Sequence, residues 1–188
     1  GSKFIELYNK KCIPIKSGNY KPKSNDILYF RSTTNNYHIF TDPYLDININ
    51  LIRLIKVLEN CKNKDITFNF VSSWFVYSSC KSLPVKENDT GEVLGFYGAT
   101  KKCAESLLIT FCEVNNIKWR IFRLCNVIGK EDKYSARKNA LQFLINEIKN
   151  GRDIELYWGG DFYRDYISVD YCCNAINFVD NNDQFYSP

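Results

Sequence analysis

Residues 66–73 have the sequence Ile-Thr-Phe-Asn-Phe-Val-Ser-Ser, and residues 96–101 have the sequence Phe-Tyr-Gly-Ala-Thr-Lys. The first stretch is rich in aromatic and β-branched residues, which is typical of a strand buried in a parallel sheet. The second begins a segment whose apolar residues, including Ala104, Leu108 and Cys112, recur at helical spacing. A buried strand followed by an amphipathic helix is the repeating unit of parallel α/β sheets, so this pair predicts the fold class.

Strand and helix patterns alternate along the rest of the chain as well. The longer strands are expected at residues 27–30, 66–73 and 119–124, with shorter ones at 12–15, 154–158 and 166–169. The helices are expected at residues 3–9, 42–58, 97–114, 141–148 and 171–179. We therefore predict an α/β fold, a doubly wound, Rossmann-like parallel sheet with helices on both faces.

Length and composition are those of an ordinary globular protein. The 188 residues, 45% hydrophobic and 24% charged, suffice for one α/β domain with a substantial core. The net charge is only +4 and the basic residues are interspersed with acids, so no nucleic-acid partner is expected. No apolar run has transmembrane length and no signal peptide is visible, so we expect no membrane partner and a cytoplasmic location.

The eight cysteines do not form a metal-site pattern. They include no Cys-x-x-Cys pair, and His38 is the only histidine. Structural zinc sites present closely spaced pairs of ligands, so no metal is expected. Cys103, Cys112 and Cys125 lie within apolar patterns. We interpret the cysteines as small core residues in a reducing compartment.

The spacing Tyr-x-x-x-Lys occurs three times, at Tyr77…Lys81, Tyr97…Lys101 and Tyr134…Lys138. The first match spans a turn-like segment, and the third lies in a polar stretch without helical apolar spacing. Only Tyr97 and Lys101 fall in an amphipathic helix, where residues four apart share a face. Ser73 lies upstream at the carboxyl end of a predicted strand, where open α/β sheets bind ligands. Context therefore favours the second match as the functional one.

Further motifs stand before and after the Tyr97 segment. They are Asp-Ile-Leu-Tyr-Phe at 26–30, Asn50 with Val-Leu-Glu-Asn-Cys at 57–61, Val-Ser-Ser-Trp-Phe-Val-Tyr at 71–77, Arg-Leu-Cys-Asn-Val-Ile-Gly at 123–129, and Arg-Asp-Tyr at 164–166. In this order, and with Glu105 in the helix of Tyr97, the chain resembles the extended short-chain dehydrogenase/reductase family, the NAD-dependent nucleotide-sugar epimerases and dehydratases. The resemblance covers nearly the whole chain.

The resemblance implies roles for single residues. These are the catalytic residues Ser73, Tyr97 and Lys101, the cofactor contacts Ser72, Tyr97 and Lys101, and the contacts Asn126, Asn139 and Arg164 to a nucleotide-sugar substrate. The implied chemistry is consistent with the side chains. A tyrosine hydroxyl has a pKa near 10, and both the Lys101 ammonium and an oxidised nicotinamide would favour its ionised form. The guanidinium of Arg164 suits a phosphate, which it can bind through two hydrogen bonds.

The resemblance also implies parts that these residues do not contain. The family's first strand and Gly-rich turn are absent, so we expect them just upstream of Gly1, and we expect the substrate-binding lobe to continue beyond the last residue. Residues 1–130 would form the dinucleotide-binding domain, and residues 131–188 part of a small substrate-binding region interleaved with it. Lys16-Ser17 stand near the position where NAD-preferring members place an acid. The expected cofactor is therefore NAD or NADP.

Residues 74 and 75 separate the reactions that the family carries out. Its dehydratases have an Asp-Glu pair after the serine, whereas this chain has Trp74-Phe75, which cannot transfer protons. This departure disfavours a nucleotide-sugar dehydratase. We expect an NAD(P)-dependent nucleotide-sugar epimerase or 4-keto reductase that dimerises through the helices bearing Glu59 and Tyr97. The alternative is a catalytically silent Rossmann-like binding or scaffold protein.

Overall fold

The computed structural model describes residues 1–33, 37–77, 83–89, 91–93, 95–132, 140–161 and 163–182. Within these residues, a central sheet has three parallel strands in the order β1-β2-β3, namely β1 (Asp26–Tyr29), β2 (Thr67–Ser73) and β3 (Lys118–Leu124). A smaller sheet pairs β4 (Asn126–Ile128) in parallel with β5 (Tyr166–Ser168). The parallel pairing was expected, whereas strand β4 was not among the predicted elements.

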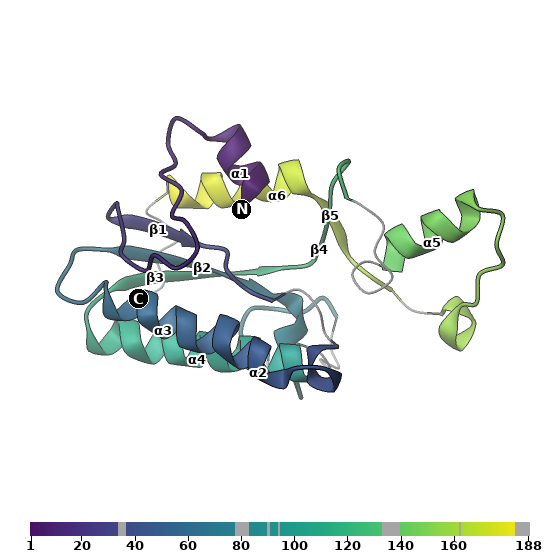
Figure 1. The fold of residues 1–188 in the computed structure, drawn as a ribbon, viewed down its shortest axis with the longest axis horizontal. Helices are drawn as coiled ribbons and strands as arrows, with labels where there is room; N and C mark the ends of the chain where they lie inside the picture. The colour runs from purple at the N-terminus through teal and green to yellow at the C-terminus, as the bar shows by residue number, and fades with distance from the viewer. Residues whose placement is uncertain are drawn as a thin grey trace.

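Helices cover both faces of the central sheet (Figure 1). The first face carries α1 (Ser2–Leu7) and α6 (Val169–Asp180), and the second carries α3 (Arg53–Glu59) and α4 (Phe96–Val114). Helix α5 (Ala140–Lys149) lies away from the sheet, beyond β4 and β5 (Figure 1). This arrangement confirms the predicted doubly wound α/β fold.

Each face of the sheet has its own apolar core. On the second face, Phe68 and Phe70 of β2 pack with Leu58 of α3 and Leu108 of α4, and none of the four is more than 1% exposed. On the first face, Phe4 of α1 packs with a set of residues from α6, namely Cys172, Cys173 and Ile176. Each such large apolar side chain contributes about 2 kcal/mol to folding by leaving water.

Most of the described cysteines are core residues, but one prediction was wrong. Cys61, Cys112, Cys172 and Cys173 are buried free thiols. Cys103 is exposed, because the helical positions Ala104 and Leu108 rather than Cys103 face the sheet. Among the described cysteines no disulfide is formed.

The predicted helix at residues 42–58 is one continuous rod with a change of winding. It consists of α2 (Pro43–Asp46), a π-helical turn η2 (Ile47–Ile52) and α3. Pro43 occupies the first turn, where its missing N–H costs no hydrogen bond. The wider π turn inserts one extra residue into the helix, a feature often found at functional sites. It carries Asn50, a buried polar residue.

Two of the predicted short strands do not form. Residues 12–15 pair with no strand within the described part of the chain, and Pro14 offers no backbone donor for a ladder. Residues 154–158 have a strand-like composition, but no strand pairs with them in the part of the chain that the structure describes. They lead instead into a 3₁₀ turn, η4 (Tyr157–Gly160), whose two glycines have positive φ values of 64° and 81°.

The predicted domain boundary at residue 130 stays a prediction. Helix α6, from the segment after that boundary, returns to the central sheet and packs beside α1 (Figure 1). Searching the described residues finds no helix that is both long and apolar enough to cross a membrane.

Candidate active site

Ser73 and Tyr97 meet at the carboxyl end of β2. The strand ends at Ser73, whose Oγ accepts a hydrogen bond of 3.4 Å from the Phe75 amide and caps the short helix η3 (Trp74–Val76). Tyr97 lies in the first turn of α4, and the rings of Phe75 and Tyr97 meet edge to face with centroids 5.5 Å apart. Burial raises the pKa of Tyr97, while hydrogen bonds with Ser32 and Ser73 act in the opposite direction. The structure therefore brings Ser73 to the Tyr97 hydroxyl.

Lys101 lies one helical turn beyond Tyr97 and is only 1% exposed. Its Nζ donates a hydrogen bond of 2.9 Å to the Val71 carbonyl and sits 4.1 Å from the centroid of the Phe70 ring. Burial lowers the pKa of Lys101 to about 8, and Glu105 opposes this shift. An ammonium held by a carbonyl and an aromatic face can still act electrostatically on a nearby oxyanion.

A buried amide holds the surroundings of Tyr97 in place. Asn50 is 2% exposed, and its Oδ1 accepts hydrogen bonds from Ser32 Oγ (3.1 Å) and from the Thr33 amide (2.9 Å). Its Nδ2 donates 3.0 Å bonds to the hydroxyls of Thr33 and Thr100. Asn50 thus joins the segment after β1 to η2 and α4. Sequence reasoning gave it no role in the site, although a lone amide among the apolar positions of a helix was an available signal.

Ser72, the predicted cofactor contact, is buried near the end of β2. It is 5% exposed, and its Oγ has no hydrogen-bond partner among the described residues. Side chains alternate along a strand, so Ser72 lies on the same face of the sheet as Phe70 and Lys101. A buried hydroxyl without a partner is uncommon in folded proteins and has bonding capacity left for a ligand.

The two described substrate candidates lie on the β4–β5 side of the site. Asn126 of β4 uses its Nδ2 to donate a 3.0 Å hydrogen bond to the Asp165 carbonyl, which fixes the segment that bears Arg164. The Arg164 guanidinium lies 5.5 Å from the Trp74 ring centroid. Trp74 in turn packs against Phe75, with centroids 4.4 Å apart. Arg164 is therefore linked to the Tyr97 end of the site through the contacts of Trp74 with Phe75 and of Phe75 with Tyr97.

Some predicted residues lie outside the described part of the chain. These are Asn139, the third substrate candidate, and Lys81, Tyr134 and Lys138 of the competing Tyr-x-x-x-Lys matches. In the ranges that are described, no group of three or more His, Cys, Asp or Glu side chains is placed to hold a metal ion.

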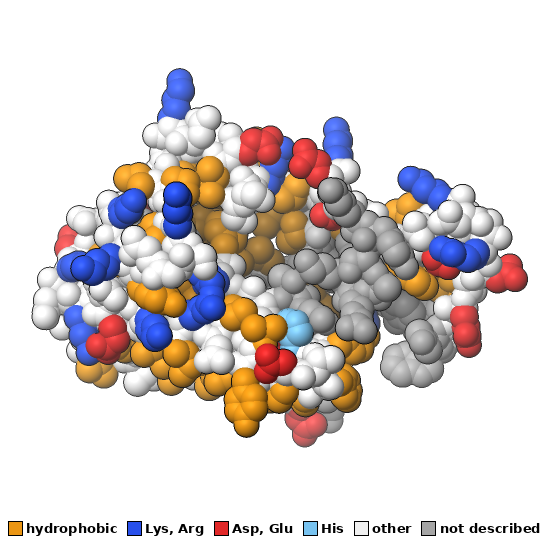
Figure 2. Space-filling model, viewed as in Figure 1, with side chains coloured by type: hydrophobic (Ala, Val, Ile, Leu, Met, Phe, Trp, Pro, Cys, Tyr) orange, Lys and Arg blue, Asp and Glu red, His pale blue; other side chains and the backbone are white. Residues whose placement is uncertain are grey.

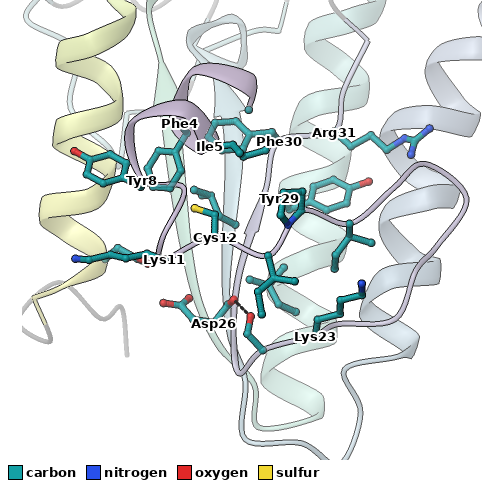
Figure 3. A pocket seen from close by; sticks show the side chains of 18 of the residues that line it. Phe4, Ile5, Tyr8, Lys11, Cys12, Lys23, Asp26, Tyr29, Phe30 and Arg31 are labelled. Carbon is teal, nitrogen blue, oxygen red and sulfur yellow. Dashed lines mark hydrogen bonds between the residues drawn. The ribbon is translucent and has the colours of Figure 1, made fainter.

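A cavity of about 470 Å³ runs along the outer edge of β1, and no residue of the Ser73–Tyr97–Lys101 set lines it. Figure 3 shows Phe4 and Tyr8 on one side and Tyr29 and Arg31 on another. Arg31 donates a 2.9 Å hydrogen bond to Ser17, which places the Lys16-Ser17 segment near the carboxyl end of β1. The predicted ribose contact at Lys16 stays a prediction.

The family model described as the NAD dependent epimerase/dehydratase family matches residues 30–185 of this chain. Protein CapI of Staphylococcus aureus is 28% identical over 138 residues, which is 72% of this chain and 40% of CapI. The chain therefore spans less than half the length of this curated relative.

Solved structures of similar fold include two sugar-nucleotide enzymes. The UDP-N-acetylglucosamine 4-epimerase of Methanobrevibacter ruminantium, in complex with UDP-N-acetylmuramic acid, superposes with a TM-score of 0.76 at 25% identity, over 85% of this chain and 52% of that one. The UDP-glucuronic acid 4-epimerase of Bacillus cereus, in complex with UDP-glucuronic acid and NAD, gives a TM-score of 0.70 at 21% identity, over 85% and 50%.

Proposed function

Because this chain belongs to the NAD-dependent epimerase/dehydratase family, we propose that it forms part of a nucleotide-sugar 4-epimerase that works by hydride transfer. The observation that carries the proposal is the meeting of Ser73 with the Tyr97 hydroxyl, one turn from the buried Lys101 cation. The similarity to the UDP-N-acetylglucosamine 4-epimerase supports the same reaction class.

The proposed base is Tyr97, which would take a proton from the sugar hydroxyl through its phenolic oxygen. Ser73 Oγ would hold the same hydroxyl by a hydrogen bond. Burial raises the pKa of Tyr97 above its ordinary value. The Lys101 ammonium lowers the cost of forming the phenolate, because a nearby positive charge favours the ionised form. Proton transfer by a positioned side chain of this kind accelerates reactions by about 10²- to 10⁴-fold.

The residues present fit a bound dinucleotide, for which we propose NAD. The Ser72 hydroxyl, buried without a partner within the described residues, can bind a polar group of the cofactor, and Lys101 lies on the same face of the sheet. When bound, NAD supplies an acceptor that takes a hydride from the sugar and returns it. NADP stays the alternative suggested by Lys16.

For the substrate we propose a nucleoside diphosphate sugar, held by Asn126, Asn139 and Arg164. Arg164 suits the diphosphate because guanidinium binds phosphate oxygens in pairs. Its contact with the Trp74 ring would orient the guanidinium towards the ligand. Trp74 and Phe75 contact Arg164 and Tyr97 as aromatic packing surfaces and have no acidic proton to transfer. This arrangement supports an epimerase or reductase over a dehydratase.

We further propose a homodimer in a reducing, cytoplasmic setting. Hydrophobic side chains lie along the lower edge of the molecule in Figure 2, where α2 and α3 run. Tyr44 is 74% exposed there, and such apolar surface is typical of protein interfaces. The predicted division at residue 130 into dinucleotide-binding and substrate-binding parts belongs to the same proposal.

The test uses the full-length protein with NAD and UDP-N-acetylglucosamine or UDP-glucuronic acid. We expect the 4-epimer to form without net reduction of NAD, and we expect Tyr97→Phe to lose at least 10²-fold in kcat while still binding nucleotide. Stoichiometric consumption of NADPH with a 4-keto sugar would identify a reductase instead. Bound nucleotide without any turnover would favour the silent binding protein, and full activity of Tyr97→Phe would contradict the proposed base.

A further inference from the structure

Glu105 and Arg123 form an ion pair next to Lys101, one helical turn further along α4. Glu105 is 1% exposed, and Arg123 comes from β3. Arg123 Nε and Nη2 donate hydrogen bonds of 3.1 and 2.9 Å to the two carboxylate oxygens of Glu105. Such two-point contacts between guanidinium and carboxylate are among the stronger ion pairs in proteins.

Arg123 also reaches groups outside the helix. Its Nη1 donates to the Tyr77 hydroxyl at 2.9 Å and to the Glu87 carbonyl at 2.7 Å, and its guanidinium stacks 4.7 Å from the Tyr77 ring centroid. Burial opposes the charge of Arg123, but its bonds with Glu105 and Tyr77 raise its pKa overall. Arg123 therefore stays charged.

Lys101 and Glu105 have the spacing at which lysine and glutamate pair on a helix. Both side chains are buried, where such a pair would be much stronger than at the surface. Yet Lys101 donates its hydrogen bond to the Val71 carbonyl, and Arg123 binds both oxygens of Glu105. Glu105 therefore pairs with Arg123 rather than with Lys101.

We propose that Arg123 is a positioning residue: by binding both oxygens of Glu105, it prevents a Lys101–Glu105 pair and leaves the Lys101 ammonium at the Val71 carbonyl, one helical turn from Tyr97. The expected effect of Arg123 on catalysis rests on the proposed function. Its expected effect on the titration of Lys101 can be measured without turnover. The other charged and titratable groups around the Glu105–Arg123 pair are Lys102, whose Nζ lies 3.9 Å from Glu105 Oε2, and Tyr77, which contacts Arg123. Tyr97 lies one turn before Lys101 on α4, and its charge environment includes Asp46 of α2.

Removing Arg123 should raise the pKa of Lys101. Burial lowers the pKa of Lys101 to about 8, and Glu105 already opposes this shift by raising it. Without Arg123, the full charge of Glu105 would act on Lys101 and raise its pKa further. The same ammonium, held by a carboxylate, would stabilise the Tyr97 phenolate less. Turnover should therefore fall while its alkaline limit moves to higher pH.

The experiment measures the Lys101 titration by NMR in protein carrying ¹³C-labelled lysine side chains, with the signal assigned by Lys101→Arg. In Arg123→Met, which keeps an apolar side chain but removes the guanidinium, we expect the midpoint to rise by about one pH unit. In the double variant Arg123→Met/Glu105→Gln the rise should disappear. Arg152→Met is the matched control, because it removes an exposed ion pair with Glu147 on α5 and should leave the Lys101 midpoint unchanged.

An unchanged Lys101 midpoint in folded Arg123→Met would overturn the inference, and so would a rise that persists in the double variant. If Arg123→Met does not fold, Arg123→Lys provides the same test, since an ammonium binds the carboxylate at one point only. It should raise the midpoint by a smaller amount, and no rise would again overturn the inference. A protein that shows the predicted titrations but no epimerase activity would refute the proposed function alone.

Discussion

The two ends of the central sheet both carry buried charged side chains, but they use them differently. At the amino end, Asn69 Nδ2 donates to Asp26 (2.6 Å), and Arg120 Nη1 donates to Asn69 (3.0 Å) and to Asp180 of α6 (3.2 Å). At the carboxyl end, the Lys101 cation is bound by a carbonyl and an aromatic ring rather than by a carboxylate.

The difference shows where the fold has left bonding capacity for a ligand. The amino-end groups bond to one another across the three strands and to α6, which ties that helix to the sheet. The carboxyl end holds a desolvated cation and the Ser72 hydroxyl, which has no partner among the described residues, at a cost in stability. Proteins commonly accept such costs at functional sites.

The largest expected effect comes from removing the cation at each end in turn. Lys101→Met should lower turnover by about 10²- to 10⁴-fold. It should also raise the free energy of unfolding at pH 7 by about 1 to 3 kcal/mol, because a buried charge with a lowered pKa is removed. Arg120→Met should instead cost about 3 kcal/mol of stability, because Asp180 loses its partner. Urea unfolding of both variants measures this contrast, and equal losses of stability would refute it.

Among the uncharged side chains at the carboxyl end, replacing Asn50 should lower the stability most. Asn50→Ala removes an amide that bonds Ser32, Thr33 and Thr100, and it takes from the buried Thr33 amide and hydroxyl the hydrogen bonds that Asn50 makes with them. We expect a loss of about 2 to 3 kcal/mol in urea unfolding, together with reduced turnover. Asn150→Ala is the control, since its side chain makes an exposed bond at the end of α5. A loss in Asn50→Ala no greater than in the control would argue against a supporting network.

A smaller effect is expected from adding one methyl group beside Tyr97. The Cβ of an alanine at Gly98 would lie 2.9 Å from Val93 Cγ1 and 3.1 Å from the Phe75 carbonyl oxygen. Gly98→Ala should therefore displace α4 or η3 and cost about 1 to 2 kcal/mol, despite the better helix propensity of alanine. Thermal unfolding measures the loss, and Ser106→Ala on the exposed side of the same helix serves as the control. A stabilised Gly98→Ala would show that the contact yields without strain.

The smallest effect tests the amino end. Partial burial and the Asp180 carboxylate raise the pKa of Asp26 to about 6. The folded protein then holds a proton on Asp26 that the unfolded chain releases near pH 4, so stability falls as the pH rises through about 6. Asp26→Asn should raise the Tm by about 2 °C at pH 8 and leave it unchanged below pH 4. A gain that is equal at both pH values would contradict the assigned titration.

Much of the fold could be predicted because its signals are local. The helical spacing of Ala104, Leu108 and Cys112 and the apolar run at residues 66–73 identified α4 and β2 nearly to the residue. Residues 12–15 and 154–158 had similar local signals but formed no strands. Strand formation depends on a neighbouring strand, and local composition does not contain that information.

The candidate site divides in the same way. Strand-end Ser73 and the helical spacing of Tyr97 and Lys101 could be identified from the sequence, because both are regularities of single elements. The supporting contacts join residues far apart in the chain, such as Asn50 with Thr100 and Arg123 with Tyr77. No periodicity encodes which of two cations binds Glu105.

By itself, therefore, the sequence determined the alternation of strands and helices and the residues that could form a Ser-Tyr-Lys set. Only the tertiary structure decided that Arg123, and not Lys101, holds Glu105, and that Arg164 lies over Trp74. The physical reason is that hydrophobic periodicity is a property of consecutive residues. A hydrogen bond between buried polar groups depends on which segments the folded sheet and helices bring together.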